Sequence, residues 1–419
     1  MMTFIPVICG MFLALSFLEQ SGYMARAAFV VDRVMRFIGL PGKSFVPMIV
    51  GFGCNVPAVL ATRTLESQRD RVLTVMMSPF MSCGARLAIF AVFTAAFFPE
   101  GGATIVFCLY MIGILIAIIT GFILRKTLLK GPSAPFILEL PSYHMPSWRS
   151  LRLHTWHRLH GFVFKAGILI VPICMLLSVL DTVTIDDHSV SVLAIFGQWV
   201  TPIFSPMGVT TENWPATVGL LTGLLAKEVV VGTLNSLYAD SNSIPMMLTY
   251  SSLQLGPELW EALTTIPENL LAMIQSVLAP FSLSMSGDEI DSNVMGQMYQ
   301  RFGGAVAAFA YLLFVLLYFP CVSTTAAIAR EIGKGWALFS IVWTTFIAYG
   351  VAVFFYQSMT LSEHPMLSVI WMISILGVYV VTFVLLKHYS PKHDSFISSK
   401  TKSPCQSSRK HRRSLCGKH

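Results

Sequence analysis

Two cysteines of this sequence stand in apolar stretches, each the same nine positions before an arginine. The pairs are Cys54 with Arg63 and Cys321 with Arg330. Each cysteine also neighbours glycine or proline residues, which disturb a helix and can free backbone carbonyls toward a cavity. A thiol in such a place can ligate a transition-metal ion, or it can be a small buried apolar side chain. The spacing alone shows that the two cysteines are equivalent.

Cys83 and Glu228 are two further candidates. Cys83 lies where Pro79 and Arg86 interrupt another apolar stretch. Glu228 belongs to a Lys-Glu pair in the middle of the apolar segment 214–238. It can be a metal ligand or the partner of a nearby base, because an unpaired charge at membrane depth is costly. Both residues therefore have a structural explanation beside the chemical one.

A third group of candidates is formed by His154, His157 and His160, which share one face of a basic, tryptophan-containing segment. Three imidazoles on one face can chelate a metal ion. A helix that lies on anionic lipid headgroups explains the basic residues and the tryptophans better. We therefore expect membrane lipids to contact this segment.

The composition indicates the type of protein that must position these residues. Of the 419 residues, 55% are hydrophobic and 12% are charged, and the mean hydropathy is +0.69. A soluble domain has about 25% charged residues, and several apolar runs here approach the ~20 residues of a membrane span. We predict an all-α polytopic membrane protein with about eight transmembrane helices and two re-entrant or broken segments. The expected spans are 3–19, 44–62, 72–98, 103–124, 161–180, 302–329, 336–357 and 366–386.

The formal net charge of +7 comes from the end of the chain. Residues 387–419 carry nine Lys or Arg and one Asp, which is +8, so the rest of the chain sums to −1. This distribution argues against nucleic acid as a partner. It places the basic tail and the basic segment 125–165 in the cytoplasm, and the acidic segments 181–212 and 240–300 outside. The same layout puts the bases of 22–43 outside.

The acidic segments can share one side only if 214–238 enters the membrane and turns back. The charges of 22–38 indicate a second re-entrant segment. The string Tyr-Met-Ala-Arg at 23–26 precedes Cys54, and the matching string Leu-Leu-Ala-Lys at 224–227 precedes Cys321. Because the matching strings occur in the same order in both halves, we predict two parallel repeats. The expected division is 1–125 for the first gate repeat, 126–160 for a basic cytoplasmic linker, 161–387 for the second gate repeat with the acidic loop 240–300, and 388–419 for the basic cytoplasmic tail.

The sequence has no pattern that indicates catalysis. Gly42-Lys43-Ser44 resembles the end of a phosphate-binding loop, but Phe37 stands where its leading glycine is required. Neither Gly-x-Ser-x-Gly nor His-Glu-x-x-His occurs. We predict that the chain is not an enzyme and holds no permanently bound cofactor.

Several strings resemble the paired gate motifs of bacterial ferrous iron transport protein B. They are GYMARAAFVVDR at 22–33, GFGCNVPA at 51–58 followed by RTLESQRDR at 63–71, LAKEVVVG at 225–232, and Pro-Cys at 320–321. The resemblance covers nearly the whole chain and is weakest in the acidic loop and the tail. Members of that family usually carry an amino-terminal GTP-binding domain and further membrane helices before these motifs. The chain therefore looks like the carboxy-terminal permease portion.

The resemblance implies uptake of Fe²⁺ across the bacterial inner membrane. Cys54 and Cys321 then lie on the metal path, with Cys83 and Glu228 as further ligands, and Fe²⁺ is the transported substrate. GTP acts only through the amino-terminal half. The implied partners are that half, small accessory Feo proteins and a second copy of the chain in a homo-oligomer. The alternatives are a transporter of another substrate, such as a nucleoside, and a fragment without transport activity.

Overall fold

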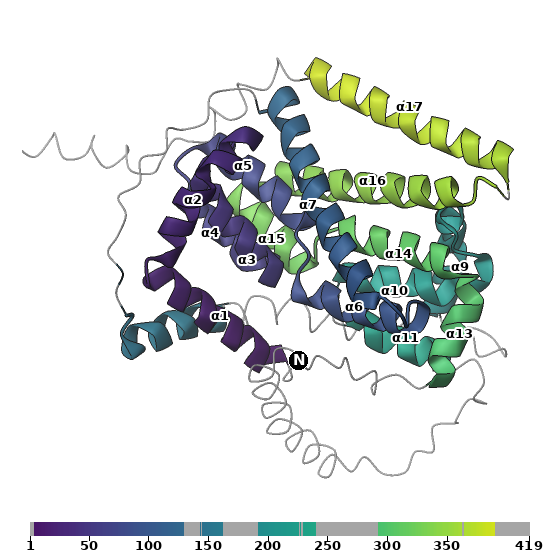
Figure 1. Ribbon diagram of the computed structural model, residues 1–419, viewed down its shortest axis with the longest axis horizontal. Helices are drawn as coiled ribbons and strands as arrows, with labels where there is room; N and C mark the ends of the chain where they lie inside the picture. The colour runs from purple at the N-terminus through teal and green to yellow at the C-terminus, as the bar shows by residue number, and fades with distance from the viewer. Residues whose placement is uncertain are drawn as a thin grey trace, which may run out of the picture.

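The structure, a computed structural model, describes residues 4–129, 143, 145–161, 192–225, 227, 229–239, 292–362 and 364–389. Within these ranges every regular element is a helix, as the sequence predicts (Figure 1). Five helical segments there are long and apolar enough to cross a membrane: Gln68–Phe97, Gly102–Thr127, Ala305–Glu331, Lys334–Met359 and Pro365–His388. Residues 162–180 of the predicted span 161–180, residues 240–291 of the predicted acidic loop 240–300, Glu228 and the tail beyond residue 389 lie outside the described residues. The domain boundaries stay predictions.

Three of these spans are single helices, namely α7 (Gly102–Thr127), α16 (Lys334–Met359) and α17 (Pro365–Tyr389). The 26 residues of α7 and of α16 extend over ~39 Å, enough to cross ~30 Å of hydrocarbon. Figure 1 shows α17 on the outside, beside α16. The Tyr379 hydroxyl donates a hydrogen bond to the Ile347 carbonyl at 3.2 Å and so attaches α17 to α16.

The other two spans are interrupted near their middle. The first consists of α5 (Gln68–Met77), the short turn η3 (Ser78–Phe80) and α6 (Gly84–Phe97). The second consists of α14 (Ala305–Leu317) and α15 (Val322–Glu331). A proline stands at each interruption, Pro79 in one and Pro320 in the other, because a residue without an N–H cannot continue the helical hydrogen bonds. We call these segments the first and second broken spans.

The predicted span 44–62 is instead a helical hairpin. Its arms, α3 (Phe45–Gly53) and α4 (Asn55–Ala61), lie side by side (Figure 1). Cys54 between them has an extended backbone, with φ −156° and ψ 132°, which turns the chain back. At the open end, Lys43 Nζ lies 2.9 Å from Glu66 Oε1, so both arms start from the same side. The run is apolar enough for a straight helix, which is why the prediction of one span was wrong.

The segment 214–238 is the second hairpin, and here the prediction of a broken segment that turns back is confirmed. Its arms are α10 (Trp214–Leu225) and α11 (Val229–Ala239). The two open ends meet where the Tyr238 hydroxyl donates a hydrogen bond to the Asn213 side chain. Lys227 lies at the tip and is buried.

The other segment predicted to be re-entrant, 22–38, is one continuous helix. This helix, α2 (Tyr23–Ile38), ends at Gly39, whose φ of 90° favours glycine. The backbone of Gly39 packs against the guanidinium of Arg125 at the end of α7. The bases of 22–43 therefore lie at the same end of the bundle as the basic end of α7, and their predicted place on the opposite side was wrong.

The two hairpins open at opposite ends of the bundle. The first is joined to the end of the second broken span, because Arg63 pairs with Glu331. The second is joined to the beginning of that span, because Arg301 lies over the ring of Tyr238, 5.8 Å from its centroid. We call the end with Arg63 and Glu331 the charged end, and the end with Tyr238 and Arg301 the aromatic end. The hairpin tips consequently point toward each other in the middle.

The broken spans also run in opposite directions. The first begins at the charged end, where Arg71 pairs with Glu331. It finishes at the aromatic end, where Phe97 stacks on Tyr299 with 5.7 Å between ring centroids. The second runs the reverse way, from Gly304 to Glu331. Each repeat is thus a hairpin followed by a broken span, and the two copies are inverted.

The predicted parallel arrangement was wrong because the sequence comparison matched unlike elements. It paired Cys54, which lies at a hairpin tip, with Cys321, which lies at the break of a span. In the structure the counterpart of Cys321 is Cys83, because each directly precedes the second helix of a broken span.

We expect Glu66 and Glu212 to face opposite sides of the membrane. Both are exposed, Glu66 at the base of the first hairpin and Glu212 just before the second. In a variant whose native cysteines are replaced, Glu66→Cys and Glu212→Cys should each react with a membrane-impermeant maleimide from one side only, and the sides should differ. Labelling of intact and of permeabilised cells measures this. Reaction of both positions from one side would contradict the inverted arrangement.

Candidate functional site

The tip of the first hairpin lies against the break of the first span. A Cβ atom added at Gly84 would be 3.9 Å from the carbonyl oxygen of Gly53. Glycine at both positions leaves the two backbones free to approach each other. Cys54 follows Gly53 and Cys83 precedes Gly84, so these two cysteines belong to adjoining segments.

The two breaks are joined to each other in the centre of the bundle. Arg86 donates a hydrogen bond to the carbonyl of Tyr318 at 3.4 Å. Cys83 and Cys321 immediately precede the second helices of the two broken spans, so each thiol stands beside one of the breaks that Arg86 joins. At the second hairpin tip, Lys227 Nζ lies over the Tyr318 ring, 4.7 Å from its centroid. Both tips and both breaks surround one region, which we call the central site; its residues are Cys54, Cys83, Arg86, Lys227, Tyr318 and Cys321.

Three of the predicted ligands lie in the central site. Cys54, Cys83 and Cys321 are half-buried cysteines outside any disulfide, and each stands immediately before a helix. The Cys321 sulfur is 3.1 Å from the Thr324 hydroxyl. In the described part of the chain, no three His, Cys, Asp or Glu side chains converge on a point where they could hold a metal ion. The fourth predicted ligand, Glu228, is outside that part, and the ligand set stays a prediction.

The central site also holds two cations that the sequence analysis did not assign to it. Arg86 is fully buried and Lys227 is 3% exposed. In the sequence, Arg86 only interrupts an apolar run. A charged residue in the middle of a membrane span is the signal that identifies it, because such residues usually face a cavity or a partner.

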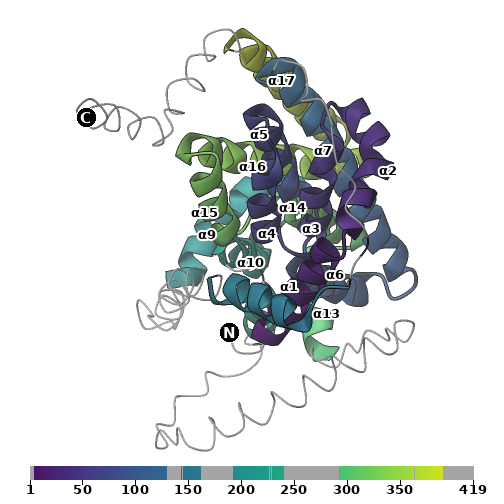
Figure 2. The same cartoon turned by 90° about the vertical axis from the view of Figure 1, so that its left-hand side faces the viewer.

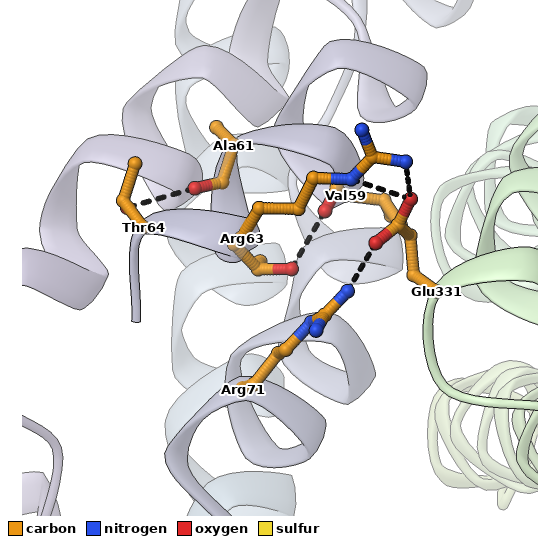
Figure 3. Close-up of polar contacts among 7 residues, drawn as sticks. Val59, Ala61, Arg63, Thr64, Arg71 and Glu331 are labelled. Atoms are coloured by element: carbon orange, nitrogen blue, oxygen red, sulfur yellow. Dashed lines mark hydrogen bonds and ion pairs between the residues drawn. The ribbon is translucent and has the colours of Figure 1, made fainter. Parts of the chain in front are cut away.

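At the charged end, Glu331 connects the two repeats (Figure 3). Its Oε1 accepts hydrogen bonds from Arg63, with the Nε at 2.8 Å, and its Oε2 accepts one from Arg71. The Glu331 side chain is 3% exposed, whereas those of Arg71 and Arg63 are 22% and 66% exposed. The hydrogen bond to Glu331, and then the charge of this carboxylate, raise the pKa of Arg63, so that the guanidinium stays charged.

A cavity of about 710 Å³ leads from the charged end toward the central site. Its wall is mostly apolar and comes from α1 (Phe4–Gln20), α3, α4 and α15. Arg330 and Glu331 line it at the charged end, and Val56 and Ser323 line it deeper, each two positions after a cysteine of the central site. The cavity thus reaches the first turns of α4 and α15, which lie side by side (Figures 1 and 2).

The segment with the three histidines is a helix over 148–161. Its buried face packs beside α1, where Arg158 pairs with Glu19 at 2.7 Å. His154, His157 and His160 are exposed, and they belong to no metal-binding group in the part of the chain that the structure describes. Trp148 and Trp156 are exposed as well. The contact with lipid headgroups stays a prediction.

Two family models match the chain. One, described as nucleoside recognition, matches residues 1–97 and 163–335. The other, described as the C terminus of ferrous iron transport protein B, matches residues 106–158. No solved structure matches.

Relatives with curated names match most of the chain. The Fe(2+) transporter FeoB of Legionella pneumophila (strain Lens) is 57% identical over 379 residues, which are 89% of this chain and 50% of that protein. The Fe(2+) transporter FeoB of Salmonella typhimurium (strain LT2) is 49% identical over 397 residues, which are 93% of this chain and 51% of that protein. The chain therefore spans about half the length of the curated relatives that it matches.

Loss of Glu331 should destabilise the bundle. Glu331→Ala leaves two arginines without their acceptor at a largely buried position, and hydrogen bonds between charged groups contribute about 1.5–3 kcal/mol each. We expect the substitution to lower the free energy of unfolding by about 1.5–3 kcal/mol. Thermal unfolding of the purified protein in detergent measures this change. Lys43→Ala is the matched control, because its partner Glu66 is 75% exposed and an exposed pair contributes about 0–1 kcal/mol. Equal effects of the two substitutions would show that Glu331 is not a structural link.

Proposed function

Because this chain belongs to the FeoB family, we propose that it forms the membrane path for uptake of Fe²⁺ across the bacterial inner membrane. Fe²⁺ is the transported substrate in this proposal, and the chain itself catalyses no reaction. The names of the relatives and the family model of their C terminus support the choice of ion.

The observation that carries the proposal is that Cys83 and Cys321 stand at the breaks of two inverted spans, and that a hydrogen bond from Arg86 to the Tyr318 carbonyl joins these breaks. Transporters built from inverted repeats bind their substrates near the membrane midplane, where broken helices meet. Fe²⁺ accepts thiolate as well as oxygen ligands. The Thr324 hydroxyl, 3.1 Å from the Cys321 sulfur, is an oxygen ligand within reach. Cys54 at the adjoining hairpin tip and Glu228 beside Lys227 complete the proposed set.

We assign the charged end to the cytoplasm. Arg63, Arg71, Arg125 and Arg330 gather there, and basic residues prefer the cytoplasmic side. The cavity then opens inward, which suits release of the ion into the cell. Since α16 begins at this end and α17 returns toward it, the C-terminal tail is cytoplasmic too.

The charged end is also where we place the partners of the chain. The amino-terminal GTP-binding half of the family can contact the segment from Arg63 to Arg71 and the helix 148–161, which are both at this end. Small accessory Feo proteins and a second copy of the chain are further proposed partners. GTP acts only through that half.

A nucleoside transporter is the second candidate, because the family model that matches the largest part of the chain is described as nucleoside recognition. A nucleoside site needs side chains that hydrogen-bond a ribose and a base. Thiols beside two buried cations are a poorer match for that chemistry. Uptake of a labelled nucleoside, measured beside that of Fe²⁺, separates the two candidates.

Replacement of Cys83 or Cys321 by serine should lower Fe²⁺ uptake by at least about tenfold, the scale of loss when a metal site is damaged. The double variant should be little worse than the worse single variant, because residues that act as a unit are not additive. The measurement is uptake of radioactive Fe²⁺ with the amino-terminal half present, normalised to the amount of protein in the membrane. Cys108→Ser is the matched control, because Cys108 is exposed on α7 and lies outside the central site. Unchanged normalised uptake in both single variants would remove these thiols from the path.

Transport should also require the amino-terminal half. We expect this chain alone not to restore iron-dependent growth in a bacterial strain that lacks its ferrous iron permease. Co-expression with the amino-terminal half of a relative should restore growth. The control is the same half expressed without this chain. Full restoration by this chain alone would contradict the dependence on GTP and indicate a passive pore.

A further inference from the structure

The carbonyl groups around the Arg86 guanidinium resemble the ligands of a cation-binding site. Its Nη1 donates hydrogen bonds to the carbonyl oxygens of Pro79 at 2.8 Å and of Met81 at 3.2 Å, and its Nη2 donates to that of Tyr318 at 3.4 Å. The side chain is fully buried. No carboxylate in the described ranges forms an ion pair with it. Three backbone carbonyls therefore face its Nη1 and Nη2 atoms, whereas its buried Nε has no hydrogen-bond partner in the structure.

The three carbonyls come from both broken spans. Pro79 and Met81 lie between α5 and α6, and Tyr318 lies between α14 and α15. Carbonyls at a break lose their helical N–H partners, and in hydrocarbon they need another donor or a cation. In transporters with broken helices, such unwound carbonyls are where Na⁺ or H⁺ binds. Na⁺ is a hard cation and takes oxygen ligands of this kind.

We propose that Arg86 is a built-in cation that occupies a potential Na⁺ site between the two inverted spans. Its guanidinium supplies the positive charge that the carbonyls need and joins the two breaks without a free ion. The backbone carbonyl oxygens of the two breaks are thereby occupied, whereas the thiols of Cys83 and Cys321 are left for the transported ion. Arg86 excludes hard monovalent cations and acts as a specificity determinant. The inference holds whichever ion the chain transports.

A purely structural arginine makes a different prediction. If Arg86 only filled space and donated hydrogen bonds, then the loss of its side chain would lower stability equally in every salt. If it takes the place of an ion, the vacated carbonyls should bind one, and a bound ion stabilises the folded state in proportion to its concentration. The dependence of stability on the kind of cation therefore separates the two roles.

The test uses Arg86→Met in the full chain, purified in detergent. Methionine reproduces the unbranched stem of arginine as far as the position of Nε but has no donor, so the carbonyls lose their partner while the packing of the stem is kept. We expect the Tm of this variant to be higher by about 2 °C or more in ~150 mM NaCl than in equimolar choline chloride. The unaltered chain should show no difference between the two salts. The increase should saturate with Na⁺ concentration.

Two variants serve as controls. Arg86→Lys keeps a tethered cation, so its Tm should not depend on Na⁺. Arg125→Met removes an arginine from the charged end, and it corrects for general effects of salt on the protein. Equal Tm values of Arg86→Met in NaCl and choline chloride would overturn the proposal, as would a sodium-dependent Tm of the unaltered chain. If Arg86→Met is lost on purification, its recovery in the two salts decides: recovery in NaCl but not in choline chloride supports the built-in cation, and equal loss in both salts overturns it.

Discussion

Each carbonyl that a helix break releases inside a bilayer must find a donor or a cation, because hydrocarbon supplies neither. The rest of this structure depends on that constraint. Polar side chains in the apolar helices are directed at backbone carbonyls: Arg86 at the two breaks, the Tyr311 hydroxyl at the Ala216 carbonyl at 3.0 Å, and the Gln357 amide at the Pro206 carbonyl at 2.8 Å. The helices of the interior can therefore be interrupted while side chains pair with these carbonyls.

The inverted arrangement follows from how the discontinuities are combined. A hairpin does not cross the membrane, so its tip needs a partner in the middle. In each copy the break of a span occupies the middle as well, and the two copies meet there through Arg86, Lys227 and Tyr318. Two segments of opposite direction thus supply each other with the contacts that neither has alone. The backbone arrangement of the central site does not select a substrate. Its side chains determine the specificity.

The sequence predicts the elements whose pattern is uniform and misses those that depend on one residue. The helices α7, α16 and α17 could be predicted from uninterrupted apolar runs. The second hairpin could be inferred because acidic loops flank it. The first hairpin could not, because the turn is made by the backbone of Cys54 alone. The three thiols were found by residue type, whereas their correct pairing needs the direction of each span. Glu331 was missed because its partners lie more than two hundred positions away in sequence.

The connection at Glu331 has a mechanical consequence. One carboxylate holds Arg63 at the base of the first hairpin and Arg71 at the start of the first broken span. Water and salt reach the Arg63 side chain, which is 66% exposed, far more easily than that of Arg71, which is 22% exposed. Arg63 donates two hydrogen bonds to Glu331 and Arg71 donates one, but solvent screens the attraction to Arg63 more strongly. If the halves of the bundle rotate against each other, the bond to Arg63 breaks first while the bond to Arg71 holds. Arg71 and Glu331 then form a pivot, about which the first hairpin can swing without separating the two repeats.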